Sequence, residues 1–158
     1  MNATVAVRRG EREDRAFVLD LGRRSASSSV SAVRTARYDD VLDAFARLTE
    51  FVYGRRHEVL IAEQNGERIG FLLLLYDVPD EVTLTEQGFV AYTAVEPLAR
   101  GRGAGRALIA AAEACALAAG MRYVSLMVTE DNAPARGLYD SAGFVTERRM
   151  LTKVLPGT

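Results

Sequence analysis

Apolar residues recur first at helical and later at strand spacing, so the chain is expected to place helices ahead of most of its sheet. Residues 4–8 alternate lightly and predict a short edge strand, which Gly10 ends. From Glu11 onward, Phe17 and Leu21 share one face of a helix whose first turn is acidic, where the helix dipole favours negative charge. The chain thus opens with a strand and a helix.

A serine-rich stretch, residues 25–29, is expected to be a loop. Beyond it, Asp39 or Asp40 can cap a second helix, which Gly54 ends. The apolar positions of this helix recur at helical spacing and are Val41, Leu42, Phe45, Leu48 and Val52. Two helices are therefore predicted before the main part of the sheet.

Strand-forming residues dominate the middle of the chain. Residues 57–63 and 68–76 flank an Asn-Gly turn, the strongest short hairpin signal, so these strands are expected to pair antiparallel. The second strand is apolar without alternation, which predicts a central strand covered on both faces. A polar, acidic connection over 77–88 leads to a further strand at 89–95. This part predicts an antiparallel meander.

The last third of the chain alternates strands and helices. A loop rich in glycine and arginine follows the strand at 89–95 and opens an alanine-rich helix, which Gly120 ends. Residues 123–128 then predict a strand. A strand-helix-strand connection of this length makes the two strands parallel, with a right-handed crossover.

A last short helix is expected to begin at Asp131 or Asn132 and to end at Gly143, and residues 144–155 are expected to supply a final strand or hairpin. The elements add up to one domain over residues 1–158. Its fold class is α/β in the broad sense and α+β in detail: a mixed, mostly antiparallel central sheet of about six to seven strands, flanked by about four helices.

Composition supports a single domain that needs no disulfide or metal, because 49% of the residues are hydrophobic and Cys115 is the only cysteine. The formal net charge of −1 argues against nonspecific nucleic-acid binding. The sequence has no run of 18 apolar residues and no N-terminal segment of the signal-peptide kind. We therefore expect a soluble, cytoplasmic protein with neither a nucleic-acid nor a membrane partner.

The glycine- and arginine-rich loop, residues 100–105, carries the clearest chemical signal. A strand that feeds a loop opening a helix aims backbone N–H groups and the positive end of the helix dipole at one point, which favours a phosphate. A P-loop would need Gly-Lys-Ser/Thr, but Gly105 is followed by Arg106. A dinucleotide fingerprint would need glycine at Arg106 or Leu108. The pattern present is R-x-x-G-x-G.

Two segments together resemble the GNAT superfamily of acetyl-CoA-dependent N-acetyltransferases. Residues 95–105, VEPLARGRGAG, are similar to that family's V-x-P-x-x-R-G-x-G-x-G segment, and residues 132–144 are similar to N-x-x-A-x-x-L-Y-x-x-x-G-F. The order of the predicted elements agrees with the family as well. The resemblance implies an enzyme that moves the acetyl group of acetyl-CoA directly to a primary amine of a small molecule or peptide, in a ternary complex.

The resemblance also implies roles for individual residues. The loop would hold the pyrophosphate of coenzyme A, the end of the preceding strand would contact the pantetheine arm, and Asn132 would both cap its helix and reach the cofactor. Tyr139 matches the family's general acid, which protonates the departing thiolate. The implied cofactor-binding residues are Ala94, Val95, Arg100, Gly101, Arg102, Gly103, Ala104, Gly105, Arg106, Asn132, Arg136 and Tyr139.

The general base stays open at this point. Many members of the family carry a carboxylate three or four residues before the valine, where this chain has Tyr92 and Ala91. Glu96 and Glu86 are the remaining candidates, each acting through water, while His57 is expected to be structural. The missing carboxylate leaves an alternative open, a noncatalytic acyl-CoA-binding sensor or interaction module.

The resemblance also implies that the acceptor contacts the loop over 25–38 and the connection over 77–88. The second of these carries four carboxylates, which favours a cationic acceptor such as a polyamine, an aminoglycoside-like amine or a lysine-bearing peptide. These carboxylates belong to Asp77, Asp80, Glu81 and Glu86. A homodimer is compatible with the sequence, which does not decide the oligomeric state.

Overall fold

A mixed five-stranded sheet forms the centre of the computed structural model, which describes residues 3–157. Its strands lie in the order β1-β2-β3-β4-β5; β1 to β4 pair antiparallel, and β4 and β5 pair parallel. The strands are β1 (Ala6–Arg9), β2 (His57–Gln64), β3 (Glu67–Leu75), β4 (Gly88–Val95) and β5 (Val124–Leu126). The predicted meander and the parallel crossover are both confirmed.

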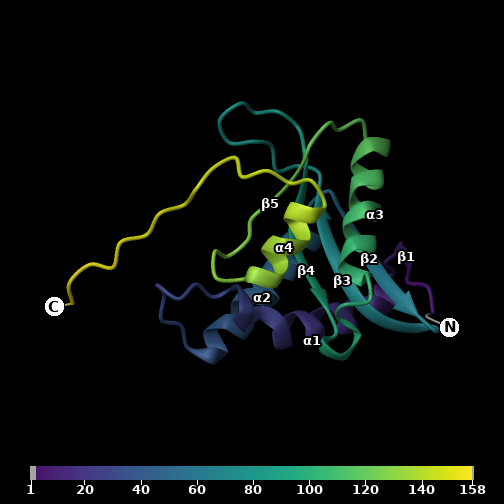
Figure 1. The fold of residues 1–158 in the computed structure, drawn as a ribbon, viewed down its shortest axis with the longest axis horizontal. Helices are drawn as coiled ribbons and strands as arrows, with labels where there is room; N and C mark the ends of the chain where they lie inside the picture. Colours follow the sequence, from purple (N-terminus) through teal and green to yellow (C-terminus); the bar gives the residue numbers. More distant parts are fainter. Residues whose placement is uncertain (1–2, 158) are drawn as a thin grey trace.

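Four α-helices cover the two faces of this sheet (Figure 1). They are α1 (Arg15–Ser25), α2 (Tyr38–Tyr53), α3 (Ala104–Ala118) and α4 (Ala133–Ser141). One hydrophobic cluster joins α1 and α2 to one face of the sheet, and a second joins α3 and α4 to the other. The result is a three-layer arrangement, as the predicted fold class requires.

β3 supplies side chains to both layers. Leu72 and Leu74 belong to the cluster under α3, whereas Phe71, Leu73 and Leu75 belong to the cluster under α1 and α2. All five side chains are almost fully buried. The continuous apolar run therefore predicted correctly a central strand that is covered on both faces.

The expected final strand or hairpin over residues 144–155 is wrong. Residues 144–157 form no helix or strand, and they run from the end of α4 away from the body of the protein (Figure 1). Strand-forming side chains need a neighbouring strand to pair with, and within the described chain the tail has none. The sheet consequently has five strands rather than six or seven.

Two local expectations also change. The serine-rich stretch is not an irregular loop but a 3₁₀ helix, Ala26–Ser29. The hydroxyls of Ser25 and Ser28 donate to the carbonyls of Gly22 and Ser25, which stabilises tight turns here. Of the two cap candidates for α4, the side chain of Asn132 caps the helix by accepting a bond from the amide of Ala135. Within the described residues, no helix has the length and apolar content to cross a membrane.

Candidate functional site

The second half of β4 has a free edge. β5 pairs with Gly88, Phe89 and Val90, so within the described residues the segment from Ala91 to Val95 has no strand on that side. A β-bulge lies where the two strands part, because Leu73 pairs with Tyr92 and Leu74 with Val90, which leaves Ala91 unpaired. The unpaired edge leaves backbone N–H and C=O groups without a partner strand, a geometry that suits pairing with an extended segment.

The glycine- and arginine-rich loop follows this free edge and leads into α3. Gly101 and Gly103 have φ values of +75° and +89°, a region that other residues rarely adopt. A Cβ atom at either position would meet nothing within 4 Å, so backbone conformation rather than crowding requires these glycines. The open space beside them lies at the N-terminus of α3, where the first-turn amides have no partner within the helix.

Three arginines lie in the loop or in the first turn of α3, and the side chains of two of them are in contact with protein groups. The guanidinium of Arg100 donates to the carbonyl of Val95 at 3.3 Å, and that of Arg106 donates to the hydroxyl of Ser141 at 2.7 Å. Arg102 is exposed on the loop. The site combines backbone amides, a helix N-terminus and positive charge, which together suit a phosphate or pyrophosphate.

α4 lies directly against the start of α3. A Cβ atom added to Gly105 would come within 2.9 Å of a methyl group of Leu138, so this glycine allows close approach of the two helices. Tyr139 is the next residue on α4. Tyr139 also belongs to the same buried cluster as Ala104, the first residue of α3. The two sequence motifs are therefore in contact with each other.

Tyr139 is 9% exposed and its ring packs edge-on against Phe144, with 5.7 Å between centroids. Burial raises the pKa of the Tyr139 phenol above its ordinary value, and the nearby Tyr92 raises it further. The phenol thus stays protonated at neutral pH. No residue within the described part of the chain forms a hydrogen bond with its hydroxyl, which leaves the proton available to a ligand.

Tyr92 occupies the strand position just after the bulge. Its ring lies edge-on against Phe45, with centroids 4.9 Å apart, and its hydroxyl is 3.0 Å from the hydroxyl of Ser25 at the end of α1. Because the Ser25 hydroxyl donates to the carbonyl of Gly22, Tyr92 donates to Ser25. Sequence reasoning missed this pair, since nothing local in the serine run indicates a partner 67 positions away.

The two candidate bases are placed at opposite ends of β4. Both carboxylate oxygens of Glu96 accept bonds from the guanidinium of Arg24, at 2.7 and 3.0 Å, which connects α1 to the residue that directly follows β4. Glu86 is exposed and precedes the first residue of β4. The Arg24 contact is a long-range feature that no local pattern in the sequence indicates.

Two of the four carboxylates in the acidic connection form salt bridges with arginines. Asp77 pairs with Arg55, and Asp80 accepts bonds from its own turn and from Arg148 of the tail. The amide and hydroxyl of Thr83 donate to the Asp80 carboxylate, and together with Arg148 they hold its pKa well below its usual range. Only Glu81 and Glu86 remain exposed without such partners among the described contacts.

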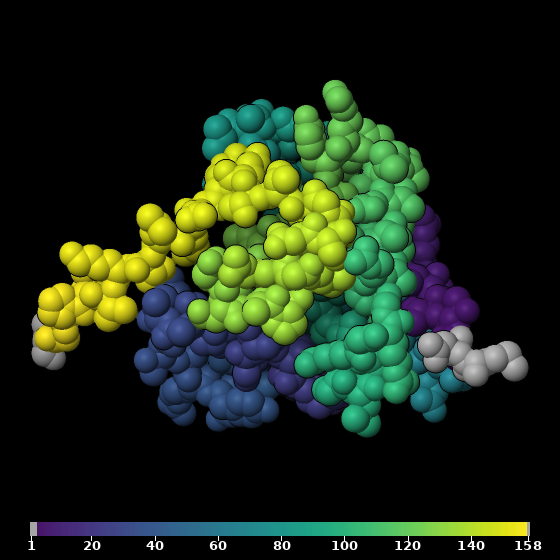
Figure 2. All heavy atoms as spheres, in the orientation of Figure 1, coloured from purple at the N-terminus to yellow at the C-terminus, as the bar shows by residue number. Residues whose placement is uncertain are grey.

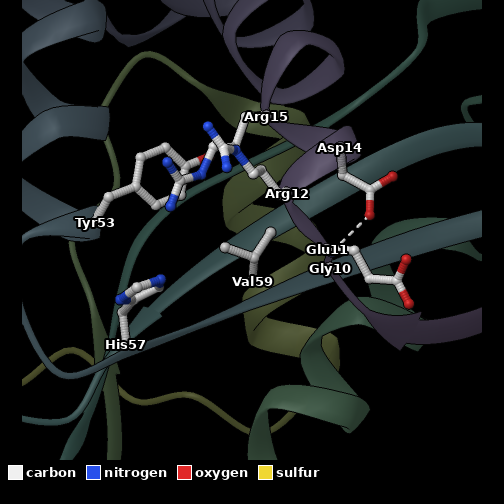
Figure 3. Close-up of a pocket in the computed structure, with 8 residues that line it drawn as sticks. All are labelled: Gly10, Glu11, Arg12, Asp14, Arg15, Tyr53, His57 and Val59. Carbon is white, nitrogen blue, oxygen red and sulfur yellow. Dashed lines mark hydrogen bonds between the residues drawn. The ribbon is translucent and has the colours of Figure 1, made fainter.

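A pocket of about 290 Å³ lies elsewhere, between the start of α1 and the β1–β2 side of the sheet (Figure 3). No predicted site residue lines it. His57 does line it, and there its Nδ1 atom bonds the carbonyl of Arg55 at 2.8 Å while its ring packs edge-on against Tyr53. These contacts agree with a structural role for the histidine.

Comparison with known proteins points to one family. A family model described as the acetyltransferase (GNAT) family matches residues 23–144. An acetyltransferase of Pectobacterium atrosepticum is 37% identical over 87 residues, which cover 55% of this chain and 57% of that protein. The uncharacterized N-acetyltransferase YhfO of Bacillus subtilis is 34% identical over 105 residues, 66% of this chain and 70% of that protein. The match thus spans little more than half of the Pectobacterium relative.

Solved structures share the fold over nearly the whole chain. A putative acetyl transferase from Pyrococcus furiosus has a TM-score of 0.82 at 23% identity, covering 96% of this chain and 100% of that one. The aminoglycoside N-acetyltransferase AAC(6')-Iy, in complex with CoA, has a TM-score of 0.70 at 17% identity, covering 98% of this chain and 97% of that one. At these identities the likeness concerns the fold alone.

Proposed function

The chain belongs to the acetyltransferase (GNAT) family, and from that premise we propose that it moves the acetyl group of acetyl-CoA to a primary amine by direct transfer in a ternary complex. The observation that carries the proposal is the contact between Gly105 and Leu138, which joins the phosphate-sized loop to the helix that holds Tyr139. Cys115 is only partly exposed and packs against the core, which argues against an acyl-cysteine intermediate.

The residues around the loop fit coenzyme A. The amides of residues 101 to 106 and the charge of Arg102 would hold the pyrophosphate, in the open space beside Gly101 and Gly103. The free edge at Ala94 and Val95 would pair with the amides of the pantetheine arm, as an added strand does. Further contacts would come from Arg100, Ala104, Gly105, Arg106, Asn132, Arg136 and Tyr139.

Asn132 can serve two purposes at once. Only its Oδ1 atom is used for the cap of α4, at 3.3 Å from the amide of Ala135. The side-chain NH₂ group keeps two donors for the cofactor. Arg136, one turn further along the same exposed face, pairs with Glu130 at the surface and could exchange that contact for a phosphate.

In the proposed reaction, acetyl-CoA supplies the activated thioester, and a neutral amine attacks its carbonyl carbon. Tyr139 then donates its phenolic proton to the sulfur as the carbon–sulfur bond breaks, and the proton lost by the amine passes to a base. Glu96 or Glu86 remains the proposed base, each through water. The Arg24 contact holds Glu96 at the end of β4, whereas Glu86 is exposed.

A noncatalytic acyl-CoA sensor is the second candidate. One observation favours it: no carboxylate stands at Ala91 or Tyr92, and the Tyr92 hydroxyl is held by Ser25. The available proton of Tyr139 favours the enzyme instead.

Calorimetry with acetyl-CoA, followed by thiol release across a panel of amines, separates the two candidates. The panel should include polyamines, aminoglycosides, lysine peptides and anionic or neutral amines, because Glu81 and Glu86 favour a cationic acceptor. We expect binding together with acceptor-dependent thiol release. Binding without such release from any amine would support the sensor, and turnover of anionic or neutral amines alone would remove the cationic preference.

Replacing Gly103 with alanine is expected to weaken coenzyme A binding by about 5- to 30-fold. The φ of +89° costs an L-residue roughly 1–2 kcal/mol, and relief of that strain reorients the amides of the loop. Gly54→Ala is a matched control, because Gly54 has an ordinary φ of −81° and ends α2. Calorimetry gives the affinities and thermal unfolding the stabilities. Unchanged affinity in Gly103→Ala would argue that the loop does not hold the cofactor.

A further inference from the structure

The pocket beside the start of α1 has a cationic end that the proposed reaction does not use. Its volume of about 290 Å³ lies at the lower limit of small-molecule sites. Residues at the start of α1, the end of α2 and the start of β2 line it, which places it on the face of the sheet opposite α3. No residue of the glycine- and arginine-rich loop lines this pocket, so a ligand here would leave the proposed coenzyme A site free.

The hydroxyl of Tyr53, the last residue of α2, is the first sign that the pocket takes a ligand. Its oxygen atom is buried and, among the described residues, forms no hydrogen bond. Buried polar groups in proteins nearly always have a partner, so this hydroxyl indicates a group that the described chain does not supply. Burial raises the pKa of the Tyr53 phenol above its ordinary value, and the phenol therefore stays a donor at neutral pH.

Two arginines extend to the same end of the pocket. The guanidinium of Arg15 lies over the Tyr53 ring, 4.5 Å from its centroid. Figure 3 shows the side chain of Arg12 reaching the same place, so that both guanidinium groups lie beside the tyrosine. Neither arginine forms a salt bridge among the described contacts, whereas Arg8 in β1 binds two carboxylates. Unpaired guanidinium groups beside an unpaired phenol favour an oxyanion, because all three supply donors.

His57 closes the pocket on the side of β2. Its Nδ1 atom donates to the carbonyl of Arg55 at 2.8 Å, and its ring lies edge-on to Tyr53 with 5.6 Å between centroids. A carbonyl only accepts, so Nδ1 carries the hydrogen and Nε2 stays without a described partner. Nε2 can accept from an O–H group of a ligand or, when protonated, donate to one of its oxygens. The contacts that hold the ring therefore leave one nitrogen for a ligand.

The acidic side chains that line the pocket lie at its other end. Val59 stands between the two ends, with Tyr53 and His57 on one side of it and Glu11 and Asp14 on the other (Figure 3). The carboxylate of Asp14 is also paired with two arginines that do not line the pocket. The end beside Tyr53 is consequently positive.

We propose that this positive end binds the phosphate group of a small molecule. The donors come from three elements and reach a ligand from different directions, which suits the tetrahedral oxygens of a phosphate better than the two oxygens of a carboxylate. Arg12 and Arg15 supply the charge, the Tyr53 hydroxyl gains its partner, and the free nitrogen of His57 takes a further oxygen. The rest of the volume leaves room for the organic part of a phosphate monoester, although inorganic phosphate offers the same chemistry.

The test uses the single histidine of the chain, because the NMR signals of its imidazole report on this pocket alone. We expect inorganic phosphate, added to the whole protein at constant pH, to shift these signals saturably with a Kd of about 1 mM. Glycerol phosphate in a parallel titration identifies the source, since tighter binding indicates a monoester and weaker binding the free ion. An equal shift with chloride at the same ionic strength, or equal affinity for acetate, would overturn the proposal.

A repeat of the titration with excess coenzyme A separates this pocket from the loop. The phosphate shift is expected to persist, and its loss would overturn a site distinct from that of the cofactor. None of these readings depends on acetyl transfer, so failure of the proposed reaction leaves them unchanged.

Variants of the lining residues identify the donors. Arg15→Gln and Tyr53→Phe are each expected to weaken phosphate binding by about tenfold, and Arg15→Lys by less, because lysine keeps the charge without the fork. Arg12→Gln repeats the test if the Arg15 variants unfold. Arg47→Gln and Tyr38→Phe are matched controls, since both residues are exposed on α2 outside the pocket. Affinities that fall no further in the lining variants than in these controls would overturn the assignment.

Discussion

Replacing Tyr139 with phenylalanine is expected to lower kcat by about 10²- to 10⁴-fold while leaving the affinity for acetyl-CoA nearly unchanged. The phenylalanine ring keeps the edge-on packing against Phe144 and the burial of the position. Only the hydroxyl is lost, and with it the proton that the departing thiolate takes up. Steady-state rates with the best acceptor of the amine panel, together with calorimetry, measure both quantities.

Tyr123→Phe is the matched control, because Tyr123 is a tyrosine of the same chain that directly precedes β5 and is 53% exposed. Its loss of a hydroxyl should leave kcat within about twofold. Equal turnover in Tyr139→Phe and the native protein would remove Tyr139 from the mechanism. A loss of cofactor affinity with kcat unchanged would instead make it a binding residue.

Replacing Asp14 with alanine is expected to lower the free energy of unfolding by about 3 kcal/mol. The Asp14 side chain is 4% exposed, and it accepts two bonds from Arg8, at 2.7 and 3.0 Å, one from Arg68 at 3.2 Å and one from the amide of Glu11. Alanine would leave these donors without their acceptor. Urea unfolding, followed by circular dichroism, gives the difference.

Asp20→Ala is a fitting comparison, because Asp20 also pairs with an arginine, Arg24, but is 66% exposed. An exposed pair of this kind contributes about 0–1 kcal/mol. If the Asp14 and Asp20 variants lost the same free energy of unfolding, burial would not make the ion pairs of Asp14 more stabilising than an exposed pair.

The same carboxylate predicts how the fold responds to acid. The Arg8 guanidinium lowers the pKa of Asp14 from its ordinary 3.8 to about 2. Because the folded-state pKa is the lower one, this contribution is fully present above about pH 4 and is lost as the pH falls toward 2. The stability difference between native protein and Asp14→Ala should therefore shrink over that window. A constant difference from pH 5 to pH 2 would contradict the assignment.

Local patterns in the sequence correctly predicted those features of the fold that adjacent residues determine. The apolar run of β3, the Asn-Gly turn and the R-x-x-G-x-G loop each carry their structure in a few adjacent residues. The bonds from Arg24 to Glu96 and from Tyr92 to Ser25 join positions 72 and 67 residues apart. Periodicity says nothing about such pairs, so the partner of the candidate base could not be predicted.

The error over residues 144–155 has a different cause. The side chains there do favour a strand, and the sequence pattern was sound as a statement of preference. Whether a strand forms depends on pairing with a neighbouring strand, and within the described residues the tail pairs with none. Local strand preference alone therefore does not decide whether a segment joins a sheet.

The bulge at Ala91 changes which positions of β4 face each side of the sheet. Before the bulge, Val90 packs with the cluster under α3, an even-numbered position; after it, the odd-numbered Val95 packs with the same cluster. Ala91 and Tyr92, two consecutive residues, both belong to the cluster under α1 and α2. The alternation of side chains between the two faces of the sheet is therefore shifted by one residue between the start of β4 and its end, where the chain approaches the loop. A protein design that moves this loop to another strand would therefore have to include the extra bulge residue, so that the loop leaves the strand from the same face.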